Sequence, residues 1–261
     1  MKKIIAIILT LTLLCAALVS CGAGNDLENV KSSGKLVVGV TVYKPMDYVD
    51  AESGEWAGFD AELAKAFAES LGVTCQLVII DWNNKVAELD AGHIDLIWNG
   101  MTASDKLGEQ IDFSVSYAKN AQVAVVKNGS TLTKEGIKNA KVAVENGSAG
   151  ETVARETIGA TNIVEKSDGQ VGALNEVLAG TSDVAIIDLT MAESVLGKGE
   201  YAELKMLDGA SYGEEIFAVG LRKGSSLKAE LDAFLKAKYE DGTMASLIQK
   251  YPVVINEDAL K

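Results

Sequence analysis

The sequence predicts an α/β protein with two lobes of similar size joined by a double-crossing hinge. Short β-branched runs alternate with stretches of helical period, and this alternation restarts at about residue 141. A further apolar run at 216–221 then returns the chain to the first unit. The repeated order of strand, helix and strand indicates parallel, doubly wound sheets, because each helix crosses over the sheet to the next strand.

The first unit contains three predicted strands and two predicted helices. Their order is a strand at 35–41, a helix at 61–71, a strand at 73–80, a helix ending at Leu89 and a strand at 92–98. Asp60 precedes the first helix and is predicted to be its N-cap, since a short carboxylate accepts hydrogen bonds from the free amides of a first turn. Apolar residues spaced three and four apart give this helix one buried face.

The second unit follows the same pattern. Its predicted elements are a strand at 141–144, a helix at 151–158, a strand at 162–164, a helix at 168–179, a strand at 184–187 and a helix at 190–196. The segment that joins the units, 116–121, contains no Pro or Gly, so it is not a loose linker. The predicted division is lobe 1 at 35–120 plus 217–261, which includes a C-terminal helix from Ser226, and lobe 2 at 121–216.

The N-terminus is typical of an exported lipoprotein. Residues 1–20 combine two lysines with an apolar run that is too short to span a bilayer, as in a signal peptide. Leu-Val-Ser-Cys at 18–21 fits a lipobox, in which Cys21 receives a lipid; an ordinary signal peptide with a nearby cysteine is the alternative. Residues 21–34 are predicted to be a flexible tether. We therefore expect a protein anchored by lipid on the outer face of the cytoplasmic membrane, at the cell surface or in the periplasm.

The composition argues against several classes of function. The formal net charge of −13 disfavours nucleic-acid binding, which needs clustered Lys and Arg. Cys75 is the one cysteine of the predicted mature domain, so no disulfide can form within it. His93 has no Ser or Cys motif that would make it a catalytic base, and no His or Cys pair has metal-ligand spacing. We therefore expect a protein that is not an enzyme and carries neither a metal nor a cofactor.

The stretch at 95–122 predicts a binding site for a small polar ligand. An apolar strand breaks at Asn99 and Gly100 and is followed by the hydroxyls of Thr102 and Ser104. Ligands of open α/β sheets bind at the carboxyl ends of strands, where backbone amides remain free.

The second unit offers two further candidates. Asp188 ends an apolar strand, where its carboxylate could pair with a ligand ammonium or could cap the following helix. Ser148 precedes a predicted helix, and its hydroxyl together with the first helix amides would suit a carboxylate. A simple N-cap is the alternative role for Ser148.

A motif around this stretch resembles a known family. Gly-Met-Thr-x-Ser at 100–104, then a short polar helix, Ile-Asp-Phe-Ser at 111–114 and Tyr117 resemble the polar amino acid-binding proteins of bacterial ABC importers, the extracellular solute-binding proteins of family 3. The resemblance implies the type II periplasmic-binding-protein fold, or venus flytrap, in which two lobes close on an amino acid-like ligand. It also implies a monomer that delivers this ligand to ABC permease subunits in the membrane.

The resemblance assigns roles to residues of both lobes. In lobe 2, Asp188 matches the aspartate that binds the ligand α-amino group. Ser148 and the backbone amide of Ala149 match the groups that bind the ligand carboxylate.

In lobe 1, the resemblance concerns polar and aromatic positions. The hydroxyl of Thr102 and the backbone at Asn99 and Gly100 match positions that hold the ligand backbone, and Ser104 is a weaker match. Tyr43 and Trp82 match the aromatic pair that sandwiches the ligand side chain, although either one alone would more often belong to a core.

One position departs from the family. The arginine that pairs with the ligand α-carboxylate in the family falls on Leu107, which carries no charge. Lys106 could supply the charge instead, or the carboxylate could be held by Ser148 and Thr102 alone. Otherwise the ligand has no α-carboxylate, and Asp188 binds an amine or another cation.

Two other functions share this scaffold. A periplasmic dehydratase-like enzyme would need a buried acid with a raised pKa in the cleft, for which Glu145 and Asp188 are the candidates. A ligand-sensing domain that docks on a membrane receptor would use the same site with a different partner. The expected function remains that of a substrate-binding lipoprotein.

Overall fold

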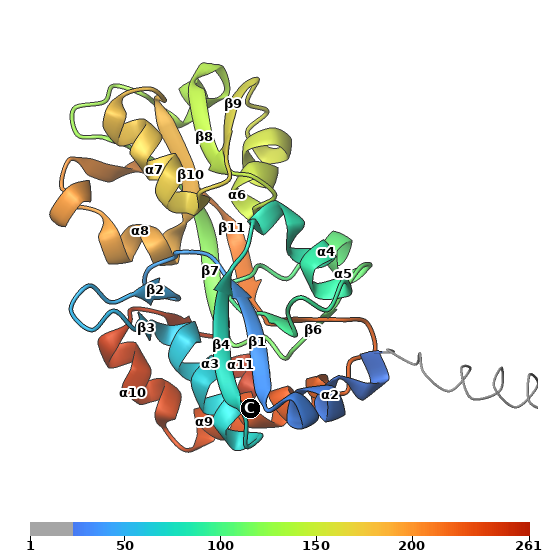
Figure 1. The fold of residues 1–261 in the computed structure, drawn as a ribbon. Coiled ribbons are helices and arrows are strands. Elements are labelled where there is room, and N and C mark those ends of the chain that lie inside the picture. Colours follow the sequence, from blue (N-terminus) through green and yellow to red (C-terminus); the bar gives the residue numbers. More distant parts are fainter. Residues whose placement is uncertain (1–22) are drawn as a thin grey trace, which may run out of the picture.

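The structure is a computed structural model that describes residues 23–261, in two lobes joined by a narrow waist (Figure 1). The predicted signal peptide at 1–20 and the predicted lipid-attachment residue Cys21 lie outside the described residues. Within residues 23–261, no helix combines the length and apolar character needed to cross a membrane.

Lobe 1 is built on a sheet of mixed direction with the strand order β4-β1-β5-β12-β6. β1 is parallel to β4 and to β5, as predicted for this unit. β12 is antiparallel to both β5 and β6, because it returns from lobe 2 directly rather than through a crossover helix. The strands are β1 (Lys35–Val40), β4 (Thr74–Ile79), β5 (Leu96–Ile97), β6 (Asp112–Phe113) and β12 (Gly220–Leu221).

The helices of lobe 1 cover this sheet. α3 buries Phe59, Leu63 and Phe67 completely, at the spacing of one helix face. Two of the helices, α10 and α11, extend beyond the predicted C-terminal helix. The other elements of the lobe are β2 (Tyr48–Val49), β3 (Trp56–Ala57), α3 (Phe59–Ser70), η3 (Trp82–Asn84), α4 (Lys85–Asp90), α5 (Asp105–Gly108), α9 (Leu227–Glu240), α10 (Thr243–Lys250) and α11 (Glu257–Leu260).

The prediction that Asp60 caps α3 is wrong. The N-cap is Gly58, with φ of +126°, where a Cβ would lie 2.1 Å from the carbonyl oxygen of Met46. Asp60 is completely buried, and its Oδ2 accepts hydrogen bonds from the Gly100 amide and the Tyr117 hydroxyl, each at 2.7 Å. Asp60 therefore fixes the start of the segment that follows β5.

Lobe 2 contains a sheet with the order β11-β7-β10-β8-β9. β8, β9 and β10 are parallel, as the second unit predicted. β7 runs antiparallel to its two neighbours, β10 and β11. The predicted helix at 151–158 is a short α-helix that continues as a turn of π-helix. The elements are β7 (Ala118–Lys127), η4 (Lys134–Asn139), β8 (Lys141–Glu145), α6 (Ala149–Thr152), η5 (Val153–Thr157), β9 (Asn162–Lys166), α7 (Gly169–Ala179), β10 (Val184–Asp188), α8 (Leu189–Val195), η6 (Gly199–Tyr201) and β11 (Leu204–Phe217).

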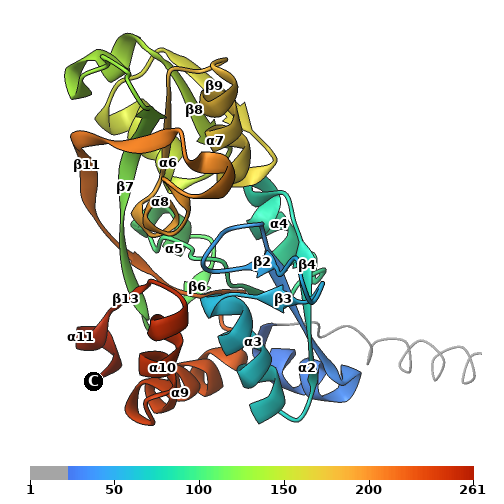
Figure 2. The ribbon, with the colours of Figure 1, turned by 90° about the vertical axis from the view of Figure 1, so that its left-hand side faces the viewer.

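Two long strands, β7 and β11, pass from one lobe to the other and form the hinge (Figure 2). They pair with each other from Leu204 opposite Lys127 to Phe217 opposite Ala118, so the hinge is a hydrogen-bonded ribbon. The start of β7 also pairs with β13 (Val254–Ile255) of lobe 1. The predicted return strand at 216–221 is divided, since β11 ends before β12 begins.

The predicted tether at 21–34 contains a helix, α2 (Asp26–Ser33), that packs on lobe 1. Val30 is buried in the lobe 1 core, and the Arg222 Nε donates to both oxygens of the buried Asp26 carboxylate at 3.1 Å. Arg222 also donates to the carbonyl oxygens of Leu89 and Ile94. A cation with five donors links three segments here, so this part of the tether is fixed to the domain.

We expect Arg222→Met to lower the free energy of unfolding by about 3 to 5 kcal/mol, because it leaves the buried Asp26 carboxylate without its cation. Urea unfolding of residues 23–261 measures this change. Lys223→Met is the matched control, since Lys223 is half-exposed beside Asp112 and should cost less than about 1 kcal/mol. Equal losses from the two substitutions would contradict the proposed role of Arg222.

Candidate ligand-binding site

A cavity of about 580 Å³ lies between the lobes, a size that suits a small organic ligand. It opens at the carboxyl ends of the parallel strands of both lobes. All ten positions predicted for ligand binding line it: Tyr43, Trp82, Asn99, Gly100, Thr102, Ser104, Leu107, Ser148, Ala149 and Asp188. The structure thus brings together residues from segments far apart in sequence, while their roles toward a ligand stay predictions.

The segment after β5 is held by buried side chains rather than left free. Asn99 accepts hydrogen bonds from the amide and hydroxyl of Thr41 and donates to Asp47 at 2.7 Å, so its side chain is engaged. Gly100 has φ of +54°, and a Cβ there would lie 2.6 Å from the Tyr43 ring. Only glycine fits this turn, which lies against Tyr43 in the cavity wall.

Ser104 and Leu107 offer no charge to the cavity. Ser104 is the N-cap of α5 and accepts a hydrogen bond from the Leu107 amide at 3.3 Å. Leu107 is half-buried and packs on an apolar cluster that contains Trp82 and Ile111. Lys106 also lines the cavity and is exposed.

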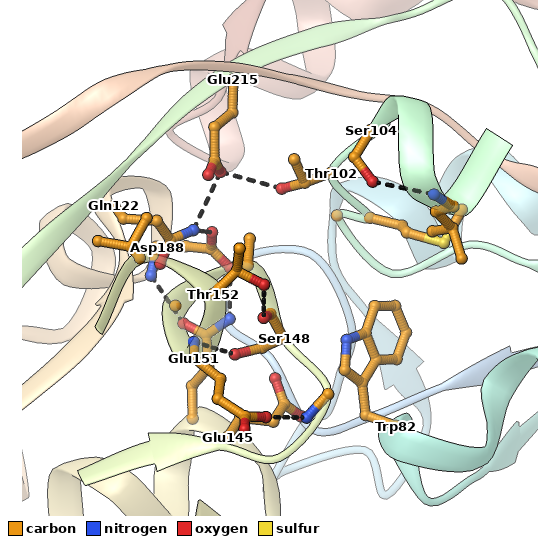
Figure 3. Close-up of a pocket in the computed structure, with 18 of the residues that line it drawn as sticks. Trp82, Thr102, Ser104, Gln122, Glu145, Ser148, Glu151, Thr152, Asp188 and Glu215 are labelled. Carbon is orange, nitrogen blue, oxygen red and sulfur yellow. Dashed lines mark hydrogen bonds between the residues drawn. The ribbon is translucent and has the colours of Figure 1, made fainter. Parts of the chain in front are cut away.

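The two predicted aromatic residues lie in the wall of lobe 1. Trp82 is buried, lies across the pocket from Asp188 (Figure 3), and has the Lys85 Nζ 4.7 Å from its ring centroid. Tyr43 is also buried, and its hydroxyl lies beside the Asp188 carboxylate. Burial, and then the nearby Asp188 carboxylate, raise the pKa of Tyr43 well above its usual value, so this hydroxyl keeps its proton as a donor.

Asp188 ends β10 and is the most enclosed predicted polar residue of lobe 2. It stands at the N-cap position of α8, but its side chain makes no capping hydrogen bond. The carboxylate instead accepts from the side-chain amides of Asn120, Gln122 and Gln170, and it is 5% exposed. The alternative that Asp188 serves as a helix cap is therefore wrong.

Sheet order explains how these amides reach Asp188. β7 lies between β10 and β11, with Gln122 opposite Asp188 and Asn120 opposite Glu215. Asn120 and Gln122 are two residues apart, so both side chains lie on one face of β7. Their amides bridge the carboxylates of Asp188 and Glu215, with contacts of 3.1 and 3.0 Å to the latter.

Glu215 also binds a predicted residue of lobe 1. Its Oε2 accepts a hydrogen bond from the Thr102 hydroxyl at 2.9 Å (Figure 3). Burial, followed by the charge of Glu215, raises the pKa of Asp188 to about 7, although the three amides oppose this shift. The arrangement is a pair of neighbouring carboxylates with amide donors and no cation bound to either.

The start of α6, predicted to receive a ligand carboxylate, has Ser148 and Glu151 bonded to amides of the chain around its first turn. Ser148 is the N-cap and accepts from the Glu151 amide at 3.1 Å. Glu151 in turn accepts from the Gly147 amide at 2.7 Å and forms an ion pair with Arg155. This is a capping-box arrangement, so the alternative role of Ser148 as an N-cap is confirmed.

The lobes touch at one side of the cavity. The Lys85 Nζ of lobe 1 donates to the Gly147 carbonyl oxygen of lobe 2 at 2.9 Å and to the Trp82 carbonyl oxygen at 3.0 Å. Gly147 has φ of +73°, and a Cβ there would lie 2.8 Å from the Asn83 backbone. Burial lowers the pKa of Lys85 to about 8. The structure therefore has the cleft closed on this side.

The sequence did not single out several residues of the cavity, among them Lys85, Gln122, Gln170 and Glu215. Glu145, considered only as a possible acid of an enzyme, is another lining residue, is buried, and has its pKa raised to about 8 by burial and then by Asp188. Polar residues at alternate positions of the apolar β7 were a usable signal for Gln122, whereas nothing local marked Glu215.

The described residues show no arrangement for metal or histidine chemistry. Within 23–261 there is no group of three or more His, Cys, Asp or Glu side chains that could hold a metal ion. His93 is exposed and lies 2.8 Å from the Glu88 carboxylate.

Comparisons with known proteins agree with this geometry. Residues 36–253 match the bacterial extracellular solute-binding proteins, family 3. The chain is similar to the arginine-binding extracellular protein ArtP of Bacillus subtilis (strain 168), with 27% identity over 238 residues, covering 90% of this chain and 92% of the relative.

Solved structures with the same fold include two informative ones. A substrate-binding protein of an ABC uptake transporter from Streptococcus pneumoniae, with bound histidine, is 30% identical, with a TM-score of 0.78 and coverage of 88% of this chain and 97% of that one. An ancestral amino acid-binding protein, AncCDT-1, described as a precursor of cyclohexadienyl dehydratase, is 29% identical, with a TM-score of 0.77 and coverage of 86% and 98%.

The fold and the interlobe cavity define the class of two-lobed solute-binding proteins. The chain belongs to the bacterial extracellular solute-binding proteins, family 3. The family and the two-lobed fold that the sequence motif implied are therefore confirmed.

We expect the ligand-free protein to lose stability as pH rises from about 5 to about 8. The folded state keeps protons on Glu145 up to about pH 8 and on Asp188 and Asp60 up to about pH 7, whereas these groups lose them at about pH 4 in the unfolded chain. Each such group contributes a slope of about −1.4 kcal/mol per pH unit inside its window.

Urea unfolding at about pH 5.5 and about pH 8 measures this dependence. Glu145→Gln removes one of the groups, so this variant should gain stability relative to the parent protein as pH rises. Glu193→Gln, at an exposed site of α8, should follow the parent protein. A parallel course for all three proteins would show that Glu145 is ionised in the folded state.

Proposed function

We propose that this protein is the substrate-binding component of an ABC importer and closes its lobes on a small ligand that carries an amino group. The observation that carries the proposal is Asp188, a carboxylate that is 5% exposed, faces the interlobe cavity and is held by amides instead of a cation. Similar proteins bind arginine and histidine, both of which carry an α-amino group.

The geometry supports a capture mechanism based on charge. When the lobes close, water leaves the cavity and the attraction between a ligand ammonium and Asp188 strengthens. The amides of Asn120, Gln122 and Gln170 hold the carboxylate in place before the ligand arrives, so little conformational entropy is lost on binding. The Tyr43 hydroxyl lies beside Asp188, and its oxygen can accept a hydrogen bond from the same ligand ammonium.

We further propose that the protein is exported and held on the outer face of the cytoplasmic membrane by a lipid on Cys21, as a monomer that delivers its ligand to permease subunits. The basic and apolar residues at 1–20 and the lipobox at 18–21 support this proposal. α2 begins at Asp26, so only a few residues would separate the anchor from the folded domain.

A second candidate function is catalysis on the same scaffold. Glu145 and Asp188 are buried acids with raised pKa values, which is the feature that a dehydratase-like enzyme requires. One solved relative is described as a precursor of such an enzyme. Incubation of the protein with each bound ligand, followed by analysis for a new product, tests this candidate.

We expect an amino-group ligand to raise the thermal unfolding temperature of residues 23–261, after unfolding and refolding to remove any carried-over ligand. The proteinogenic amino acids and their decarboxylated amines are the test compounds. A ligand present at one hundred times its dissociation constant adds about 2.7 kcal/mol of stability.

Asp188→Asn should abolish this shift, because loss of a buried charged partner typically costs about 2 to 5 kcal/mol of binding free energy. Asp208→Asn, at an exposed position of β11, is the matched control and should bind normally. Unchanged binding by the Asp188 variant would contradict the assigned role of Asp188.

We also expect the ligand to make the protein more compact, because closure about the β7–β11 ribbon brings the lobes together. Small-angle scattering with and without a ligand identified by the unfolding experiment measures the radius of gyration. An unchanged radius with a saturating ligand would argue against capture by lobe closure.

A further inference from the structure

Glu145 is a second buried carboxylate in the cavity. It ends β8, the strand beside β10, and Asp188 ends β10. Both residues line the cavity, and the charge of Asp188 acts on Glu145, so the two carboxylates lie in the same region. Glu145 is 4% exposed, lines the cavity, and appears below Asp188 in Figure 3.

The carboxylate of Glu145 has one oxygen without a hydrogen-bond donor among the described residues. Its Oε1 is buried and has no hydrogen-bond partner among the described residues. A charged carboxylate that is buried without a partner costs free energy, so such a group either keeps a proton or binds a cation. Oε1 lies next to Gly169, where a Cβ would be 3.5 Å from it.

The nearby cations of the protein are engaged elsewhere. The Lys85 Nζ donates to the carbonyl oxygens of Trp82 and Gly147. Arg155, the cation contributed by lobe 2, pairs with Glu151 and Glu165. Neither is bonded to Glu145 among the described residues, and the charge of Lys85 only partly opposes the burial that raises the pKa of Glu145. A ligand cation could supply the remaining charge.

The charges around the cavity disfavour a ligand carboxylate. Within residues 23–261, three basic residues line it, Lys85, Lys106 and Arg155, against five acidic ones, Glu145, Glu151, Glu156, Asp188 and Glu215. An added carboxylate would lie beside these groups in a medium of low dielectric, where repulsion is strong. Leu107 and Trp82 supply an apolar wall that suits a methylene chain.

We propose that the natural ligand is a small organic dication without a carboxylate, a diamine or an amine that carries a guanidinium group, with one charge at Asp188 and the other at Glu145. The inference rests on the proposed function and specifies its ligand. Two positive charges neutralise the two buried carboxylates, and the carbon chain between them contacts Leu107 and Trp82.

Calorimetric titration of refolded residues 23–261 tests the ligand class. The probes are putrescine, agmatine, n-butylamine, L-lysine and L-arginine. Putrescine or agmatine should bind at least about tenfold more tightly than n-butylamine, which lacks the second charge, and more tightly than either amino acid. Tighter binding of L-lysine or L-arginine than of both dications would overturn the inference.

Two variants test the role of Glu145. Glu145→Gln should weaken binding of putrescine or agmatine about tenfold and change binding of n-butylamine less than about threefold, because only a dication reaches this residue. Glu193→Gln removes the same charge from the surface of lobe 2 and should leave both affinities unchanged. The comparison of probes on the parent protein needs no variant and holds even if Glu145→Gln folds poorly.

The remaining outcomes separate this inference from the proposed function. Binding of an amino acid that depends on Asp188 but not on Glu145 would overturn the inference and leave the proposed function standing. Absence of binding by every amino-group probe would contradict both. If Glu145→Gln weakens the binding of putrescine and n-butylamine equally, the inference is overturned. Glu145 would then stabilise the shape of the site and would not bind the second charge of the ligand.

Discussion

The carboxylate of Asp188 lies in a closed cleft on three side-chain amides, and no cation of the protein binds it. Burial and the charge of Glu215 raise the pKa of this carboxylate, whereas the three amides fix its position and lower its pKa. The sheet order places β7 between Asp188 and Glu215, so both carboxylates share the same amides. The chemistry of the cavity follows from this arrangement, because the lobes enclose more acid than the protein itself neutralises.

Most of the fold could be predicted from the sequence, because alternating periodicity marks each buried strand and amphipathic helix. The parallel order within each unit followed from the same alternation. What could not be predicted depends on distant contacts. β12 is antiparallel to β5 because it follows β11 directly as the chain returns from lobe 2. α2 is fixed to lobe 1 by Arg222, which is nearly two hundred residues away in the sequence. Asp60 has the local sequence pattern of a helix cap, but its carboxylate accepts hydrogen bonds from Gly100 and Tyr117 instead.

The site was predictable where it lies at strand ends. Asn99, Gly100 and Asp188 follow apolar strands directly, and carboxyl ends of strands are where such sheets bind ligands. Gln170 and Glu215 carry no comparable signal, since one opens a helix and the other lies in the polar β11. Two groups predicted to bind a ligand also bond to the protein. Ser148 accepts from the Glu151 amide at the start of α6, and the Thr102 hydroxyl donates to Glu215. Their roles toward a ligand stay predictions.

The position of β12 also limits the order in which the chain can fold. β12 lies between β5 and β6, so β6 has no neighbour in its sheet until residues 220–221 have been made. Lobe 2 is continuous in sequence and can form its sheet while the C-terminal helices are still missing. During synthesis or export, the sheet that the first residues of lobe 1 begin can therefore be completed only when almost the whole chain is present. The lobe that starts first is completed last.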